Sequence, residues 1–477
     1  MKTLLCVLIL PVLLLVGCEN AELVNPAGVT PVTAIPAPDT DNVAAMCTIL
    51  ERERGRNWLR VITVLETLAQ TNSLCEDGVS IESQLYLAHL AYGTLLEDAG
   101  RDAEARESYQ AALEYDSIGE EAAVRLQRLQ IATPIPPERC EAGAVTTAIE
   151  NFPAYAPTEG DFVTLSETGF VLDEDPFPVY GANYYPRETP FAYFLTETNP
   201  EVVGAELDII QRSGINTLRI FLRNDDLFIC PGNGAVPIAD NFYRLDSIIR
   251  IIAEKGFRLI VVLNQNTDLQ AFPLYDNPRH VIEQTQFIVE RYKDEPAILA
   301  WDVRDRGDID YRSGRFERET VLAWLADMTQ MIRQIDPNHP VTAGWWQDSS
   351  ATAPLVDFVS FQHYGEYEAL RQRIAILRDS VQKPILLIAI GYSTFSLDET
   401  AQRNLLFQSF EEARHNELAG WLIYMAFDYP RPVTCIEPNC PGDGKDIDHY
   451  GLWNTSYFPK LAVDAVKVIT GVEDETE

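Results

Sequence analysis

The sequence is short of positive charge. It has 37 lysine and arginine residues against 72 aspartate and glutamate residues, so the formal net charge of the 477 residues is −35. A chain this acidic repels polyanions, which argues against nucleic acid as a partner. The sequence also lacks the Cys-x-x-Cys and paired-histidine patterns of zinc sites, and no Gly-x-Gly-x-x-Gly follows the first predicted strand. We therefore expect neither a metal nor a nucleotide cofactor.

The apolar run near the N-terminus, from Leu4 to Val16, is too short to cross a bilayer as a helix. It ends in Leu15-Val16-Gly17-Cys18, which is similar to the signal of bacterial lipoproteins. The resemblance implies cleavage before Cys18, lipidation of this cysteine and anchoring to the outer face of a bacterial membrane. An ordinary secretory signal is the alternative. Both interpretations predict export.

Cysteine is scarce as well. Of the eight cysteines, Cys6 falls in the predicted signal and Cys18 at the predicted lipid site, which leaves six. An even number in an exported chain permits three disulfides, although the sequence leaves their pairing open. The likeliest local pair is Cys435 with Cys440. The six cysteines are Cys47, Cys75, Cys140, Cys230, Cys435 and Cys440.

Composition divides the chain into segments. A tether rich in proline and threonine follows the signal, then a stretch with helical periodicity, a second proline-rich linker, and a long region in which apolar strands and helical patterns alternate. With 46% hydrophobic residues, the chain can bury sizeable cores in two or three domains. The predicted segments are a signal peptide at 1–17, a tether at 18–41, a helical domain at 42–133, a linker at 134–160 and an alternating domain at 161–472.

The helical domain contains one clear repeat. Its glycines, alanines and tyrosine have the spacing of a tetratricopeptide-like helix pair, with helices near 84–98 and 102–115. Segments 43–54 and 57–71 would form a degenerate preceding pair, and 119–131 a capping helix. The resemblance implies a groove for a protein partner, and a spacer or lid is the alternative that we favour. The residues with this spacing are Gly93, Gly100, Ala105, Tyr109, Ala112 and Leu113.

The alternating domain contains eight short apolar runs, as strands buried on both faces require. Helical patterns separate them, except near 350–356, where the connection is too short for a good helix. The fold class is therefore α/β, a (β/α)8 TIM barrel preceded by a small all-α domain, with a doubly wound sheet as the alternative. The expected strands are 177–184, 216–222, 258–264, 298–303, 340–345, 357–362, 384–390 and 419–426. The expected helices are 200–213, 245–255, 279–293, 316–335, 367–381, 398–416 and 456–470.

Six motifs in this domain resemble, in order, those of the family-five-like glycoside hydrolases of the cellulase and mannanase type. They are Phe177 to Tyr185, Leu218 to Ile220, Trp301 to Gly307, Asp336 to Gly344, Asp357 to Phe361 and Lys383 to Gly391. The resemblance covers most of residues 168–470 and implies a sugar-cleaving barrel. Its chemistry would lie at the carboxyl ends of the strands.

The departures from the family pattern fall on the chemistry. The fourth-strand pattern Trp-Asp-x-x-Asn-Glu-Pro has Arg306 in place of the acid/base glutamate. The seventh-strand pattern Lys-Pro-x-x-x-x-Glu-x-Gly has Ala389 at the nucleophile, and Gln362 replaces the histidine of His-x-Tyr. Retaining glycosidases need two carboxyl groups about 5–5.5 Å apart. Because a methyl group cannot attack and a guanidinium does not donate its proton usefully, we expect little or no hydrolysis.

Other carboxylates lie just past predicted strand ends, namely Asp305, Asp348, Glu366 and Asp428. Catalysis by relocated acids would use Asp305 and Glu366. The alternative is that these side chains accept hydrogen bonds from loop amides or pair with arginines.

Aromatic and amide side chains at the strand ends resemble a sugar platform, because rings stack on pyranoses while amides and charges bind hydroxyls. We assign Trp301, Trp421 and Tyr424 to the core instead. The candidate substrate-binding residues are Asn183, Tyr184, Arg219, Asn264, Trp345, Trp346, Gln362, Tyr364, Tyr392 and Asp428.

These patterns together predict a surface-anchored lipoprotein whose barrel binds an oligosaccharide or polysaccharide without efficient hydrolysis. The expected partners are this glycan and a membrane reached through the lipid at Cys18. Two alternatives remain: an active glycoside hydrolase, and a scaffold that binds a protein partner at the helical repeats.

Overall fold

The computed structural model describes residues 43–71, 75, 80–98, 101–115, 122, 125–126, 129, 148–229, 236–265, 274–275, 278–430 and 446–472. The chain divides into two compact units between Thr133 and Pro134. The predicted signal, the tether, the lipid site at Cys18 and the Cys435–Cys440 pair lie outside the described residues. Within the described part of the chain, no helix is both long enough and apolar enough to cross a membrane.

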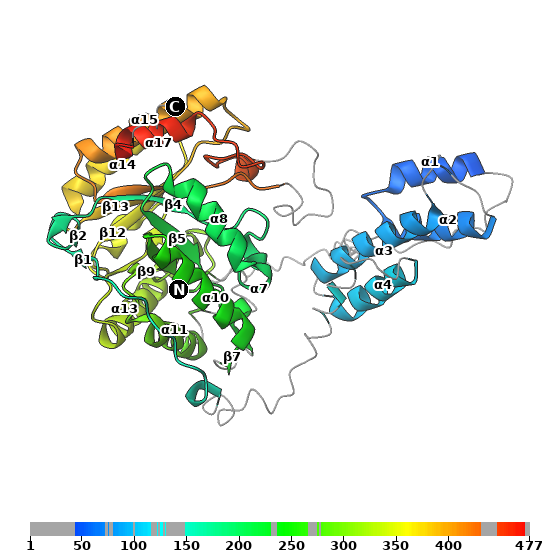
Figure 1. The fold of residues 1–477 in the computed structure, drawn as a ribbon, viewed down its shortest axis with the longest axis horizontal. Coiled ribbons are helices and arrows are strands. Elements are labelled where there is room, and N and C mark those ends of the chain that lie inside the picture. Colours follow the sequence, from blue (N-terminus) through cyan, green and yellow to red (C-terminus); the bar gives the residue numbers. More distant parts are fainter. Residues whose placement is uncertain are drawn as a thin grey trace, which may run out of the picture. The chain divides into compact units, whose positions relative to one another are not determined.

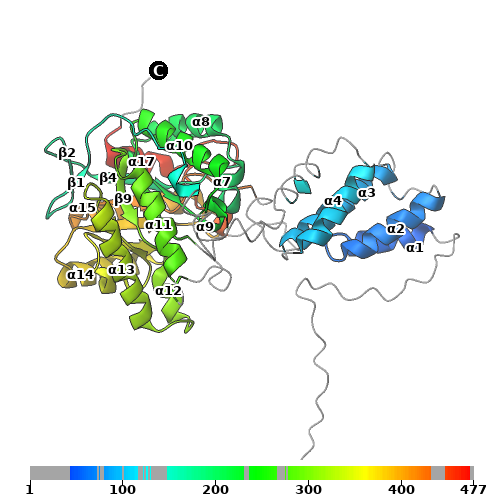
Figure 2. The same cartoon turned by 90° about the horizontal axis from the view of Figure 1, so that it is seen from below.

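The first unit is helical. The predicted helices at 43–54, 57–71, 84–98 and 102–115 are present as α1 (Val43–Glu53), α2 (Trp58–Thr71), α3 (Ile81–Asp98) and α4 (Asp102–Tyr115). Figure 1 and Figure 2 show α1 alongside α2 and α3 alongside α4. The predicted capping helix at 119–131 is described only at residues 122, 125, 126 and 129.

Two local features hold this helical unit together. A Cβ at Gly93 would come within 2.6 Å of the Tyr109 ring, so the absence of a side chain lets α3 approach α4. A disulfide joins Cys47 on α1 to Cys75, which is one of the pairings that the sequence leaves open.

The second unit is a (β/α)8 barrel, as the sequence predicts. Its strands are fully or nearly fully buried, which explains their continuous apolar runs. They are β4 (Val179–Asn183), β5 (Thr217–Phe221), β8 (Arg258–Val262), β9 (Ile298–Asp302), β10 (Val341–Thr342), β11 (Gly344–Trp345), β12 (Val359–His363), β13 (Ile385–Ile390) and β14 (Gly420–Ile423).

The parallel sheet runs in the order β10-β9-β8-β5-β4-β14-β13-β12-β11. Its two outermost members, β10 and β11, are the two halves of the predicted fifth strand, interrupted at Ala343. Val341 and Thr342 pair with β9, whereas Gly344 and Trp345 pair with β12. The sheet therefore returns to its starting strand and closes into a barrel.

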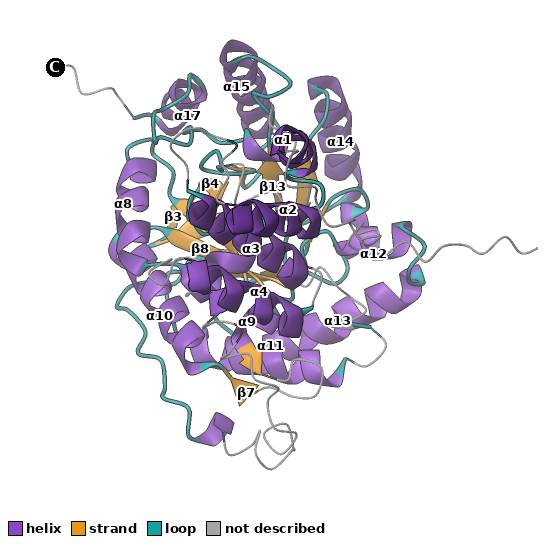
Figure 3. Ribbon diagram, turned by 90° about the vertical axis from the view of Figure 1, so that its right-hand side faces the viewer, coloured by secondary structure: helices purple, strands orange, loops and turns teal. Residues whose placement is uncertain are grey.

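Helices cover the outside of the barrel, and Figure 3 shows them in purple around the orange strands. Their buried residues recur at helical spacing, as Phe242, Leu245, Ile249 and Ile252 do on α10, so each presents one apolar stripe to the sheet. They are α8 (Pro200–Gln211), α10 (Ala239–Glu254), α11 (Arg279–Tyr292), α13 (Arg318–Ile335), α14 (Tyr367–Ser380), α15 (Glu399–His415) and α17 (Ala462–Thr470).

The remaining elements are short. The fifth connection holds only the 3-10 turn η3 (Ser349–Thr352), which confirms that it is too short for a good helix. The others are β1 (Thr164–Leu165), β2 (Phe170–Leu172), β3 (Asp175–Pro176), η2 (Phe191–Tyr193), α7 (Phe194–Glu197), α9 (Asn224–Leu227), β6 (Phe228–Ile229), β7 (Val236–Pro237), α12 (Gly307–Arg312) and η4 (Asp446–Asp448).

Buried polar groups at the amino ends of β9 and β10 form a cluster that we call the amino-end network: Tyr155, Glu295, Trp301, Asp336 and His339. Asp336 Oδ2 accepts from Trp301 Nε1 at 2.6 Å and lies 2.6 Å from His339 Nδ1. The other His339 nitrogen lies 3.1 Å from the carbonyl of Glu295, whose carboxylate accepts from the Tyr155 hydroxyl at 2.7 Å. Every charge in this network is buried and has a partner.

Candidate functional site

The carboxyl end of the barrel holds a second buried polar cluster, which we call the inner network: Asn183, Arg219, Asp302, Asp305 and Gln362. Arg219 on β5 is its hub. Its Nη2 donates to Asp302 Oδ2 at 2.6 Å and to Asp305 Oδ1 at 2.7 Å, and its Nη1 donates to Asn183 Oδ1 at 2.9 Å. Gln362 Nε2 donates to the same oxygen of Asp305 at 2.6 Å. Four barrel strands and the segment after β9 thus converge on one guanidinium.

Charge and space in the inner network are tightly matched. The side chains of Arg219 and Asp302 are 1% and 0% exposed. Burial raises the pKa of Asp302, and this rise is opposed by the charge of Arg219 and by the Gly344 amide, which donates to Asp302 at 2.9 Å. A Cβ at Gly344 would lie 2.5 Å from Arg219 Nη2, so only glycine fits beside this ion pair.

The structure brings the three replaced family positions together. Arg306 Nε donates to Gln362 Oε1 at 2.9 Å, and Gln362 on β12 is the register partner of Ala389 on β13. Ala389 is 1% exposed. The guanidinium, the amide and the methyl group therefore occupy one neighbourhood at the carboxyl end of the barrel.

Three of the four substitute carboxylates are engaged by neighbours. Asp305 is bound by Arg219 and Gln362, as described above. Asp348 accepts from the Tyr311 hydroxyl at 2.6 Å and from Arg318 at 3.2 Å.

The third, Asp428, accepts from Lys460 Nζ at 2.7 Å and from the Gly451 amide at 2.8 Å. Glu366, by contrast, is exposed at the start of α14. Asp302 and Asp305 meet at one nitrogen of Arg219, but Asp302 has no exposed surface with which to reach a substrate.

Above the inner network lies a group of partly exposed side chains that we call the rim: Arg306, Trp346, Tyr364, Tyr424 and Tyr450. The Tyr364 and Tyr424 ring centroids are 4.9 Å apart, and those of Tyr424 and Tyr450 are 5.0 Å apart. The Trp346 ring lies 6.3 Å from Tyr364. The Arg306 guanidinium carbon sits 4.9 Å from the Tyr364 centroid. The rim thus offers aromatic faces around one cation.

Gly391 on the loop after β13 makes room for the rim. A Cβ at this position would lie 2.8 Å from the Tyr450 ring and 2.9 Å from the Tyr424 Cβ. This glycine is the one that the seventh-strand motif retains although the glutamate before it is missing.

Burial corrects several of the predicted sugar contacts. Tyr184 is 0% exposed and its hydroxyl donates to Glu206 at 2.8 Å, while Trp345 is 1% exposed. Tyr392 is 6% exposed and bonds Ser409, and Asn264 is 0% exposed. These four side chains offer no free face to a ligand, because their rings or amides are enclosed by the barrel and its helices. Asp428, held by Lys460, is 4% exposed and is removed on the same ground.

The remaining predicted contacts divide between the two clusters. Asn183, Arg219 and Gln362 belong to the inner network, where they hold other side chains in place, and only Trp346 and Tyr364 belong to the rim. Trp301 and Trp421 are buried as predicted. Tyr424 is a rim residue and not a core residue, so its assignment to the core is wrong.

Two residues near this end were missed by sequence analysis. Tyr450 follows no strand, and its single signal is an aromatic in a polar loop. Asp226 on α9 lies 3.4 Å from Arg223, and burial raises its pKa to about 7. No sequence pattern indicates the enclosure that causes this shift.

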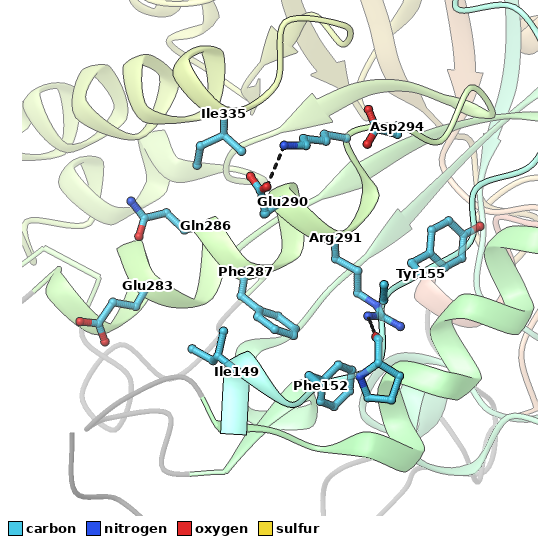
Figure 4. Close-up of a pocket in the computed structure, with 13 residues that line it drawn as sticks. Ile149, Phe152, Tyr155, Glu283, Gln286, Phe287, Glu290, Arg291, Asp294 and Ile335 are labelled. Carbon is cyan, nitrogen blue, oxygen red and sulfur yellow. Dashed lines mark hydrogen bonds and ion pairs between the residues drawn. The ribbon is translucent and has the colours of Figure 1, made fainter. Parts of the chain in front are cut away.

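A cavity of about 810 Å³ lies elsewhere, between residues 149–155 and the outer helix α11 (Figure 4). Arg291 crosses it, with Nη1 donating to the carbonyl of Pro153 at 2.6 Å and its guanidinium 5.0 Å from the Phe152 ring centroid. Glu290 pairs with Lys293 at 2.7 Å. The cavity therefore contains a packed arginine but no pair of unengaged carboxylates. Among the described residues, no group of three His, Cys, Asp or Glu side chains is placed to hold a metal ion.

Comparisons with known proteins agree with this fold. No family model matches the chain. Mannan endo-1,4-beta-mannosidase F of Aspergillus clavatus is 27% identical over 216 residues, which is 39% of this chain and 47% of the relative. The chain spans about half the length of the relatives that it matches.

Solved structures extend the comparison over the barrel. GH5_18 from Streptomyces cattleya in complex with GlcNAc superposes with a TM-score of 0.54 at 15% identity, covering 63% of this chain and 81% of the other. The endo-1,4-beta-mannanase from Rhizomucor miehei has a TM-score of 0.50 at 20% identity, covering 65% and 100%. The second unit of this protein is therefore a mannanase-like (β/α)8 barrel with the fold of glycoside hydrolase family 5.

Proposed function

We propose that the barrel binds an oligosaccharide or polysaccharide at the rim and hydrolyses it little or not at all. The observation that carries this proposal is the single neighbourhood formed by Arg306, Gln362 and Ala389, in which the family resemblance expects two glutamates and a histidine. Glycoside hydrolysis of the retaining kind needs one carboxyl group to protonate the leaving oxygen and another to attack the anomeric carbon. Neither group is supplied there.

Sugar binding does not depend on those carboxyl groups. Interactions that the ground state shares with the transition state persist when the reacting groups are removed. The partly exposed rings of Trp346, Tyr364, Tyr424 and Tyr450 supply stacking faces, and the inner network fixes their base. The named relatives act on mannan, so β-1,4-linked mannose is the first ligand to test.

We further propose export and lipid anchoring at Cys18. The signal-like sequence supports this, and so does the Cys47–Cys75 disulfide, because disulfides persist in oxidising compartments. On this proposal the helical unit stands between the anchor and the barrel as a spacer. A tetratricopeptide-like groove for a protein partner is the alternative role of the same helices.

The test combines binding and turnover on the purified exported chain. We expect calorimetry to detect mannan or glucan oligosaccharides, and product analysis to show no hydrolysis above a buffer blank. Asp305→Asn and Glu366→Gln serve as probes for relocated acids. Turnover that either variant abolishes would establish an active hydrolase and refute the proposal.

A further inference from the structure

The second inference concerns the ligand class and rests on the proposed function of the rim. Arg306 precedes α12 in the left-handed region, with φ 50° and ψ 33°. This conformation is uncommon for any residue other than glycine, asparagine or aspartate, and it costs on the order of 1 kcal/mol. The backbone is held there because the Arg306 amide donates to the carbonyl of Gly344 at 3.0 Å. The direction of the side chain is thus set by the fold.

The guanidinium of Arg306 is also held in place. Its Nε donates to Gln362 Oε1 at 2.9 Å, and its central carbon lies 4.9, 5.8 and 5.9 Å from the ring centroids of Tyr364, Trp346 and Tyr424. The side chain nevertheless remains 33% exposed. Within the described residues, neither terminal nitrogen donates to a carboxylate or a carbonyl.

The other two arginines at this end of the barrel are used up by the protein. Arg219, 1% exposed, spends its nitrogens on Asp302, Asp305 and Asn183. Arg304, with a side chain 8% exposed, is paired with Asp310 at 3.0 Å. Arg306 alone of these three points a planar pair of donors outward.

The nearest carboxylate does not satisfy Arg306. Asp305 Oδ2 lies 3.9 Å from Arg306 Nε, beyond hydrogen-bonding distance, while Oδ1 is bound by Arg219 and Gln362. Asp305 is thus turned inward to the buried charge of Arg219. A carboxylate arriving from solvent could instead take both terminal nitrogens of Arg306 in a bidentate pair, the geometry that a guanidinium favours.

We propose that the rim selects acidic polysaccharides, in which a hexuronic acid residue places its carboxylate on Arg306 and its ring on the surrounding tyrosines and Trp346. The fixed guanidinium supplies the charge contact, and the aromatic faces distinguish a sugar acid from a simple anion. No covalent step is involved.

A matched pair of ligands tests this. Hexamers of β-1,4-linked mannose and of β-1,4-linked mannuronic acid differ only in the group at C6. Calorimetry on the full exported chain at low salt should show the acidic hexamer binding about tenfold tighter, the size of a charged hydrogen bond. Raising the salt should weaken only the acidic ligand.

Variants assign the preference to its residue. Arg306→Gln should abolish the tenfold difference while the neutral hexamer binds as before, and Arg306→Lys should keep only part of it because a lysine lacks the planar fork. Arg378→Gln is the matched control, since this arginine is 41% exposed at the last turn of α14 and pairs only loosely with Glu417 at 3.6 Å. Equal urea midpoints for all variants would show that folding is unaffected.

The outcomes separate the two proposals. A neutral hexamer that binds as tightly as the acidic one, or a preference that survives Arg306→Gln, overturns the acidic ligand class and leaves sugar binding at the rim in place. Inorganic phosphate that competes as well as the acidic hexamer also overturns it, because the site would then be a plain anion site. If neither hexamer binds, the proposed function itself fails.

Discussion

The barrel contains two buried polar networks that use the same residue types for different ends. The amino-end network encloses Glu295, Asp336 and His339 completely, and each polar atom described there bonds another part of the fold. The inner network at the carboxyl end is equally buried around Arg219, but it supports a partly exposed arginine and four rings. Conserved stability is expected at the amino face of such barrels and chemistry at the carboxyl face. The difference lies in what each network leaves open to solvent.

Neighbouring residues of β9 show how one strand serves both networks. Trp301 and Asp302 point to opposite faces, as successive strand residues must. Trp301 reaches Asp336 between the strand and its helices, whereas Asp302 reaches Arg219 inside the barrel. Because both networks share this strand, separating structural from binding effects requires substitutions in each.

The largest effect is expected from Arg219→Leu. It leaves Asp302 buried without its cation, and breaking a buried ion pair from one side costs about 3–5 kcal/mol. We expect the urea midpoint of the barrel to fall accordingly and glycan affinity to fall with it, since Asp305 and Gln362 lose their anchor. The double variant Arg219→Leu with Asp302→Leu should recover part of the stability. A single variant as stable as the parent would show that the hub does not hold the network.

A somewhat smaller loss, confined to stability, is expected from Asp336→Ala. The indole of Trp301 and the ring of His339 would lose their shared acceptor, at a cost of about 3 kcal/mol for buried donors left unpaired. Unfolding by urea measures the loss, with Asp336→Asn as a milder control. Glycan affinity of the folded variant should equal that of the parent. A matching fall in affinity would break the distinction between the two ends.

The opposite pattern is expected from Trp346→Ala at the rim. Removing one partly exposed stacking face should lower glycan affinity by about 1 kcal/mol, or roughly fivefold, while the urea midpoint stays within error. Calorimetry and unfolding on the same preparation give both values. Phe407, an exposed aromatic on α15, provides the control Phe407→Ala, for which we expect unchanged affinity.

The smallest effect concerns pH. Burial raises the pKa of Asp226 to about 7, above its ordinary value, so between about pH 4 and pH 7 the folded chain holds a proton that the unfolded chain releases. Stability from this group is therefore present at low pH and is lost as the pH rises through 7.

Asp226→Asn should remove this slope, making the variant about 1 kcal/mol more stable relative to the parent at pH 8 than at pH 4. Unfolding at the two pH values measures the difference. An unchanged slope would mean that Asp226 is solvated in solution.

The sequence predicted the barrel because its strands are buried on both faces and its helices are amphipathic. It did not predict the break at Ala343, since 341–345 is a continuous apolar run. The interruption arises because the amide and carbonyl of Gly344 bond Asp302, Arg306 and Gln362. Apolar pattern carries no information about such side-chain partners.

The replaced positions were predictable for a different reason. Arg306 and Ala389 are placed by their register with strand motifs, which a sequence displays directly. Exposure was not predictable, because it depends on loops and on the outer helices. Tyr392 and Tyr424 follow neighbouring strands, yet the first packs on α15 and the second on Arg306. The rim could be approached from sequence only as a set of aromatic candidates.

The break in the fifth strand gives the barrel a seam. β10 and β11 each contribute two paired residues, and at Gly344 between β9 and β12 the closure passes through the side chains of Asp302 and Gln362. Amide hydrogens beside Ala343 should therefore exchange with deuterium sooner than those of neighbouring strands, because local opening needs few ladder bonds to break. Since Gly344 also accepts from Arg306, a ligand that immobilises the rim would slow exchange along this seam, and the position of the binding site would be written into the breathing of the backbone.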